Sequence, residues 1–172
     1  MPFLLREKKL LLYSSCILVI ATLGGGILQH FFLSDIFDSA VIDPNKNNHW
    51  WIYFKNNAIT CVIIMLGIFI YAITTIYLLL FNGFVIGVSI VSAMDRGASI
   101  PDLIVALLPH GVFEIPALII AGMIGLKGFT FYHQKKDKYY YYRLLQTVLF
   151  VLICLLFASF IEAYITVPLQ MK

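Results

Sequence analysis

A histidine and a glutamate stand four residues apart in an otherwise apolar part of the chain. On a helix, His110 and Glu114 lie on one face and within reach of each other. Ionisable groups in such surroundings usually face a protein interior or a water-filled cavity. Three roles are open for the pair: joining packed helices, handling a substrate or a proton, or general acid–base catalysis.

Two prolines flank this pair and predict the shape of its helix. Pro109 and Pro116 each remove a backbone donor and oppose regular helix, and Gly111 follows His110 directly. We therefore expect a kinked or broken helix at this point. Carbonyl groups freed by such a break are tolerated at membrane depth only where protein or water covers them.

Four further polar side chains are candidates for the same surroundings. One is a glutamate near the end of the last apolar run, and the others are asparagines that could supply amide partners. The predicted polar core or substrate path contains His110, Glu114, Asn56, Asn57, Asn82 and Glu162.

Metal, cofactor and nucleotide chemistry is not indicated by the sequence. The other histidines are His30, His49 and His133, which lie outside this segment, whereas zinc needs three or four ligands. The three cysteines stand apart in apolar runs, and the chain contains no CxxC, HExxH or P-loop motif. We expect no metal and no cofactor, and any ATPase that serves this chain must be a separate polypeptide.

The composition places the elements that carry these residues in a membrane. Of the 172 residues, 61% are hydrophobic and 12% are charged, and the mean hydropathy is +0.91. A soluble domain averages about 45–50% apolar and about 25% charged residues, and one of this size could not hide so much apolar surface. The net charge of +3 is too small and too dispersed for nucleic-acid binding. A polytopic membrane protein in contact with the lipid bilayer remains.

The apolar runs predict an all-α fold with about five membrane-spanning helices. A span needs about 20 apolar residues, so the uncharged stretch from Asn56 to Met94 must hold two spans, with a tight turn between Tyr71 and Phe81. The first run follows a basic start, as in a signal peptide, but it lacks a clear cleavage site and reads as a retained helix. We expect one membrane domain over 1–172, with spans at 10–33, 56–75, 76–94, 101–126 and 144–167.

Basic residues predict the orientation of these spans. Eight Lys and Arg lie in the amino-terminal segment and the 127–143 loop, against four in the other loops and at the carboxyl end. The positive-inside rule then places the amino terminus in the cytoplasm and the carboxyl terminus outside. The tyrosines at 139–142 are either an interfacial anchor or a partner surface. The loop offers a docking surface for a partner through Lys135, Lys136, Lys138 and Arg143.

Small residues at four-residue spacing predict where helices pack closely. Gly83 and Gly87 form a GxxxG motif, and Ala117, Ala121 and Gly125 repeat the spacing after the proline pair. These faces could be used within the bundle or between copies of the chain, so a homo-oligomer stays open.

Several of these residues together resemble the stage II sporulation protein M family. The specific part is the octet His110-Gly111-Val112-Phe113-Glu114-Ile115-Pro116-Ala117, supported by Asn56, Asn82-Gly83, Gly87 and the ending Ile161–Thr166 before Pro168. The resemblance covers most of residues 50–168 and implies an all-helical, five-span protein of the bacterial cell membrane. Proteins of this family act in engulfment during sporulation or are encoded in gene clusters for circular bacteriocins. The resemblance therefore implies one of these two roles.

Three functions follow from the residues and the resemblance together. The first is a non-enzymatic component that assists transport, maturation or self-protection for a hydrophobic or circular bacteriocin peptide, with a separate ABC-type ATPase or other membrane subunits. The second is a scaffold of a sporulation engulfment complex that recruits peptidoglycan hydrolases. The third is an intramembrane enzyme that uses His110 and Glu114. The short external loops favour the first.

Overall fold

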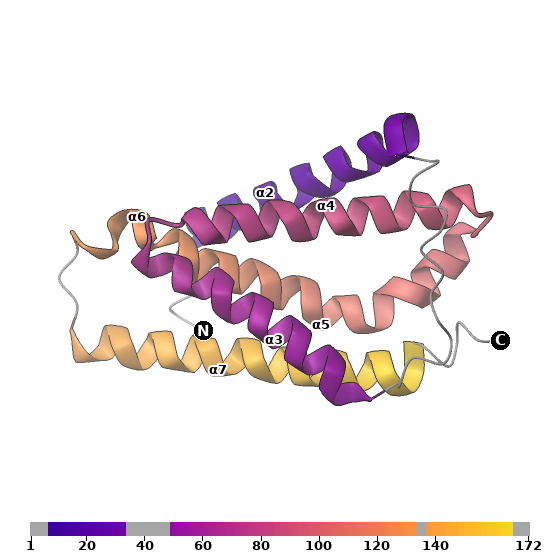
Figure 1. Ribbon diagram of the computed structural model, residues 1–172. Coiled ribbons are helices and arrows are strands. Elements are labelled where there is room, and N and C mark those ends of the chain that lie inside the picture. The colour runs from indigo at the N-terminus through magenta and orange to yellow at the C-terminus, as the bar shows by residue number, and fades with distance from the viewer. Residues whose placement is uncertain (1–6, 34–48, 134–136, 167–172) are drawn as a thin grey trace.

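The computed structural model describes residues 7–33, 49–133 and 137–166, and every element in these ranges is helical (Figure 1). Five α-helices are long, and one is a single turn. The elements in chain order are α2 (Lys8–Leu28), α3 (Trp50–Leu66), α4 (Ile73–Asp95), α5 (Ile100–Leu126), α6 (Gly128–Phe131) and α7 (Lys138–Ile161). Two π-helical segments, η1 (Gln29–Leu33) and η3 (Glu162–Thr166), continue α2 and α7, and a 3₁₀ turn, η2 (Gly67–Phe69), ends α3.

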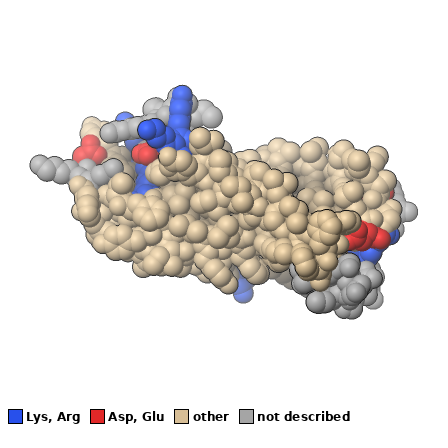
Figure 2. All heavy atoms as spheres, turned by 90° about the horizontal axis from the view of Figure 1, so that it is seen from above, with Lys and Arg blue, Asp and Glu red and all other residues tan. Residues whose placement is uncertain are grey.

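Five helices are long and apolar enough to cross a membrane, which confirms the predicted fold class. They cover Lys8–Phe32, Trp50–Phe69, Ile73–Asp95, Ile100–Phe131 and Lys138–Thr166. On the visible face in Figure 2, the charged side chains gather mainly at the two ends of the bundle and leave an apolar band between them. This distribution is the one a bilayer requires, since its core solvates no charge.

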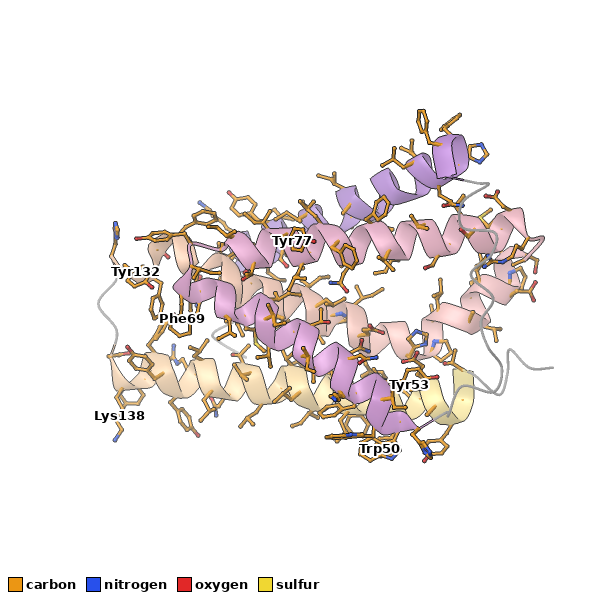
Figure 3. All side chains as sticks on the ribbon, viewed as in Figure 1. Trp50, Tyr53, Phe69, Tyr77, Tyr132 and Lys138 are labelled. Carbon is orange, nitrogen blue, oxygen red and sulfur yellow. The ribbon has the colours of Figure 1, made fainter. Side chains whose placement is uncertain are left out.

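Two span boundaries differ from the sequence prediction at aromatic residues. The second span begins at Trp50 instead of Asn56, and the last begins at Lys138 instead of Leu144. Trp50 packs in a stacked arrangement on Phe160, with ring centroids 4.7 Å apart. Aromatic residues thus form the first turns of both helices, as Trp50 and Tyr53 show for α3 in Figure 3.

The turn between the second and third spans lies earlier than the predicted boundary at residue 75. The second span ends at Phe69, and Tyr71 and Ala72 turn the chain with φ of 52° and 61°. Thr74 and Thr75, which lie within the window predicted for the turn, belong to α4. Their hydroxyls donate to the carbonyls of Ile63 and Ile64 at 3.3 and 2.7 Å, and so tie the start of α4 to the last turn of α3.

Replacing Ala72 with glycine is expected to stabilise the protein. Ala72 is fully buried and left-handed, a conformation that costs a residue with a Cβ roughly 1 kcal/mol and costs glycine nothing. Ala72→Gly should therefore raise the free energy of unfolding in detergent by up to about 1 kcal/mol, measured by titration with SDS. Ala72→Val, which keeps a Cβ and adds bulk, should lower it, and a lower value for the glycine variant would contradict the prediction.

The second half of α5 forms the centre of the bundle. All residues from Ala117 to Leu126 are buried except Ile119. A Cβ added at Gly122 would fall 2.8 Å from Leu79 of α4, and one added at Gly125 would fall on Thr75 and on the Ile64 carbonyl. Ala117, Ala121 and Gly125 are therefore the face by which α5 meets its neighbours.

Gly83 and Gly87 lie where α4 meets α2. A Cβ added at Gly83 would stand 2.6 Å from the Leu18 carbonyl oxygen, and one added at Gly87 would stand 2.7 Å from the Gly26 backbone nitrogen. Absence of a side chain at these positions lets the two backbones touch along much of their length. The two helices run side by side, and α2 diverges from α4 only toward its end (Figure 1).

The predicted basic loop at 127–143 is largely helical. Lys127 ends α5 with 4% of its surface exposed, and its ammonium lies 2.9 Å from the Glu7 carboxylate and 5.3 Å from the centre of the Tyr140 ring. Lys127 therefore belongs to the interior and not to an exposed docking surface. Lys138 and Arg143 are exposed on α7, while Lys135 and Lys136 lie outside the described residues.

Candidate functional site

The helix that carries the histidine and the glutamate is bent and unbroken. Pro109 and Pro116 both lie inside α5, which continues from Ile100 to Leu126 with a bend of 30°. Neither proline can donate to the carbonyl four residues earlier, so the helix loses two hydrogen bonds within two turns. Of the two predicted shapes, kinked or broken, the structure has the kinked one.

His110 is joined to the end of the last span. Its Nδ1 lies 3.3 Å from the Thr166 hydroxyl oxygen, which connects positions 56 residues apart in sequence. The imidazole is half-buried, and Thr166 is buried. The hydrogen bond links α5 to η3 at the level of the bend.

The glutamates of α5 and η3 belong to the same electrostatic surroundings. Glu162 of η3 lies within electrostatic range of Glu114 of α5, and both carboxyl groups are partly buried. Tyr53 of α3 lies in range of Glu162, and the buried thiol of Cys61 lies in range of Glu114. Within the described part of the chain, no Lys or Arg forms an ion pair with either glutamate.

The π-helical geometry of η3 contributes to this arrangement. π-helical turns are rare in proteins, and those that occur are often found at functional sites. Glu162 begins the segment and Thr166 ends it, and both meet α5, which packs against η3. We call His110, Glu114, Glu162 and Thr166 the α5–η3 polar cluster.

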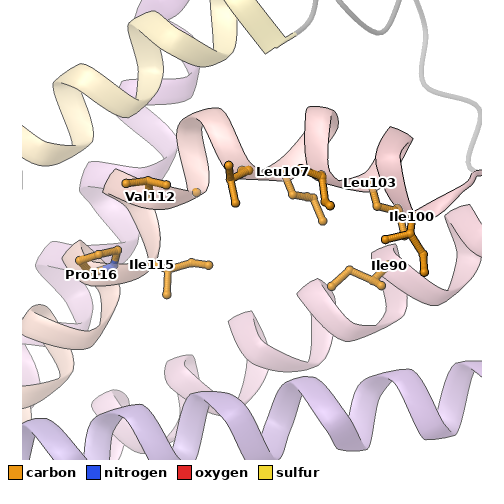
Figure 4. A pocket seen from close by; sticks show the side chains of 10 residues that line it. Ile90, Ile100, Leu103, Leu107, Val112, Ile115 and Pro116 are labelled. Carbon is orange, nitrogen blue, oxygen red and sulfur yellow. The ribbon is translucent and has the colours of Figure 1, made fainter.

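An apolar groove lies on another side of the same bent segment. It has a volume of about 470 Å³ and runs between α4 and the first half of α5 (Figure 4). Drug-sized ligand sites range from roughly 300 to 1,000 Å³. The lining is aliphatic apart from backbone and includes Ile90, Leu103, Leu107, Val112, Ile115 and Pro116. Gly111 also lines the groove, so the octet contributes to both the groove and the polar cluster.

The predicted asparagines are not joined to the polar cluster by any hydrogen bond in the described residues. Asn82 donates to the carbonyl of Leu78 on its own helix at 2.7 Å. Asn56 is exposed on α3, and Asn57 is half-buried next to it. The structure therefore brings together His110, Glu114 and Glu162 out of the six predicted polar residues.

Sequence reasoning missed three members of this neighbourhood. Thr166 enters the prediction only as part of the family-like ending, and Tyr53 and Cys61 are not among the predicted site residues. All three come from helices other than α5, so no spacing rule within one helix could find them. In the described residues no group of three or more His, Cys, Asp or Glu is arranged to hold a metal ion.

Five spans, a central small-residue helix and a polar cluster at a proline bend define a multi-pass helical membrane protein. Residues 11–167 match the stage II sporulation protein M family, and the chain belongs to that family. It is also similar to an uncharacterized protein of Methanocaldococcus jannaschii, with 31% identity over 131 residues that cover 72% of this chain and 74% of the relative. No protein of solved structure matches the chain.

Proposed function

We propose that this chain is a non-enzymatic membrane component that assists transport, maturation or self-protection for a hydrophobic or circular bacteriocin peptide. A separate ATPase would supply the energy, since the sequence contains no P-loop. The observation that carries the proposal is the double role of the bent segment of α5. It lines an apolar groove and also presents His110 and Glu114 to η3.

An apolar peptide in a membrane needs both kinds of surface. Its side chains pack against aliphatic walls, and its exposed backbone or terminal groups need hydrogen-bond partners that lipid cannot supply. The groove offers the first and the α5–η3 polar cluster offers the second. In this proposal the amino terminus faces the cytoplasm and the carboxyl terminus faces outside.

The partner surface would lie at the α6 end of the bundle. Lys138 and Arg143 are exposed there, near the exposed rings of Phe129, Tyr132 and Tyr139. Figure 3 shows Tyr132 and Lys138 at this end. Such a combination of cations and aromatic rings is common at membrane surfaces and at protein interfaces. We propose this end, with Lys135 and Lys136, as the docking site for the ATPase.

The family supports a second candidate function. Its description, stage II sporulation protein M, names sporulation. The second candidate is therefore a scaffold of a sporulation engulfment complex that recruits peptidoglycan hydrolases. Such a scaffold needs packed helices and a partner surface, but it does not need a site that binds a small peptide. The two candidates therefore differ in what accompanies the chain in its native membrane.

Affinity purification of the full chain from its native membrane, followed by mass spectrometry, is expected to recover an ATPase and a small apolar peptide. The double variant His110→Ala/Glu114→Gln removes the imidazole and replaces the carboxyl group with an amide, and both original groups would contact the peptide. Recovery of the peptide should fall about tenfold, the change that corresponds to about 1.4 kcal/mol. Ser89→Ala, which removes an exposed hydroxyl on α4, is the matched control and should recover the peptide unchanged.

Other outcomes of this purification contradict the proposal. A peptidoglycan hydrolase in place of the ATPase and peptide would support the scaffold. Conversion of a precursor peptide by the purified chain alone would contradict the non-enzymatic part, particularly if the double variant His110→Ala/Glu114→Gln had lost that conversion.

A further inference from the structure

The two halves of α5 differ in how firmly the bundle holds them. No residue from Ile100 to Pro116 is buried, whereas Ala117 to Leu126 is almost entirely buried. We call the first half, Ile100–Pro116, the α5 arm. One continuous helix is therefore fixed in the core at one end and peripheral at the other.

Both ends of the α5 arm are tied to other parts of the chain. At its start, a tight turn connects it to α4, where the Ala98 N–H donates to the Ala93 carbonyl at 3.0 Å. The helix then begins with a capping box, in which the Ser99 N–H donates to Asp102 Oδ2 at 2.9 Å. At its other end, Ala117 enters the core. Any movement of the arm is therefore largest at its middle.

The middle of the α5 arm leans toward the last span and away from α4. His110 contacts Thr166 at 3.3 Å, and the Phe113 ring lies 6.1 Å from the Phe157 ring of α7. On the α4 side lies the apolar groove, with Ile90 on one wall and Leu107 on the other. Figure 4 shows the aliphatic side chains of the arm directed into this space. The arm is bowed outward, with contacts on its polar side and open space on its apolar side.

The residues at the bend permit the bow to change. Pro109 and Pro116 leave the carbonyls of Val105 and Val112 without their usual intrahelical donors, so fewer hydrogen bonds resist a change of angle. A Cβ added at Gly111 would meet only Ile115 Cδ1, at 3.8 Å. Among the described residues, no neighbouring element is packed against the backbone at this glycine.

We propose that the α5 arm is a gate with two positions. In the bowed position described here, the His110–Thr166 hydrogen bond holds the groove open. In the closed position the bond is released, and the aliphatic side chains of the arm pack against α4 and fill the groove. Packing drives helix association within a membrane, so the closed position gains contacts that offset the lost hydrogen bond.

Spin-label distances between Ser89 of α4 and Val105 of the α5 arm, neither of which lines the groove, test the gate. Both positions are exposed, and the labels are attached to introduced cysteines in a chain whose Cys16, Cys61 and Cys154 are alanine. Thr166→Val removes the hydroxyl and keeps the side-chain shape. It should raise the share of the shorter distance relative to the longer one by about threefold, as expected from losing one average interhelical hydrogen bond. Thr166→Ser keeps the hydroxyl and should leave the distribution unchanged.

A second pair of labels, at Leu80 of α4 and Ile153 of α7, reports on the rest of the bundle and should not change. If Thr166→Val disturbs this control pair, His110→Leu removes the same hydrogen bond from the other side and gives the same test. An unchanged Ser89–Val105 distribution in the valine variant would overturn the gate, as would equal shifts in the valine and serine variants.

The gate rests on the proposed function in one respect only, which is that the molecule entering the groove is an apolar peptide. The distance measurement needs no peptide and no ATPase. A failure of the gate would therefore leave the purification result intact, and absence of the peptide would leave the distance result intact.

Discussion

Gly87→Ala is expected to lower the free energy of unfolding by about 1–3 kcal/mol, the usual cost of forcing an extra methyl group into a packed interface. The new Cβ would fall on the Thr22 carbonyl oxygen and 2.7 Å from the Gly26 backbone nitrogen. Both contacts are with backbone atoms of α2, so no side chain can rotate to relieve them. The two helices must separate, and the longest contact in the bundle is weakened along its length.

Gly24 provides the matched control for this variant. It lies in α2 close to the same interface, yet a Cβ added there meets nothing within 4 Å. Because glycine within a helix is about 0.5–1 kcal/mol less favourable than alanine, Gly24→Ala should stabilise the protein slightly. Unfolding by SDS titration in detergent measures both variants. Equal effects of the two substitutions would show that close contact at Gly87 does not hold α2 against α4.

Glu7→Gln is expected to destabilise the chain by about 1–3 kcal/mol, more than a surface carboxylate would. The carboxylate lies 2.9 Å from the ammonium of Lys127, whose side chain is only 5% exposed, while that of Glu7 is 25% exposed. Removing the negative charge leaves the buried ammonium with less compensation, and buried charges are costly when their compensation is reduced. The Tyr140 ring, 5.3 Å from the ammonium, offsets part of this loss.

A double-mutant cycle separates this interaction from general perturbation. Glu7→Gln, Lys127→Met and the double variant should show a coupling energy of about 0.5–3 kcal/mol in SDS titration. Asp95→Asn changes an exposed carboxylate at the other end of α4 and should stay within about 0.5 kcal/mol of the unsubstituted chain. Additive single effects would indicate that the two side chains contribute independently.

The spans could be predicted from the sequence because bilayer thickness and polarity constrain length and composition directly. The bend in α5 could be predicted because proline acts on its own helix, whatever surrounds it. The turn between the second and third spans was predicted only to lie between Tyr71 and Phe81. Its exact place at Tyr71 and Ala72 could not be predicted, since neither residue type favours φ above zero. Local chemistry was sufficient where one helix determined the outcome.

The polar cluster could be predicted only in part, because some of its contacts join different helices. Four-residue spacing placed His110 and Glu114 together, but Thr166 reaches His110 from 56 residues away. Lys127 counted toward a basic loop because its partner, Glu7, lies 120 residues earlier in the chain. Asn82 was interpreted as a partner of the cluster, whereas its amide bonds to its own helix. Pairings between distant helices depend on the fold and leave no trace in local spacing.

The threonine bonds at the start of α4 have a consequence for how the protein is made. The hydroxyls of Thr74 and Thr75 donate to carbonyls in the last turn of α3 from within the same hairpin, and the intervening turn is only a few residues long. The stretch from Asn56 to Met94 carries no charged group, so no charge has to be buried where these two spans pair. The second and third spans are thus suited to leave the translocation machinery as a preformed pair. The first span can then meet α4 through Gly83 and Gly87 before the synthesis of α5 is complete.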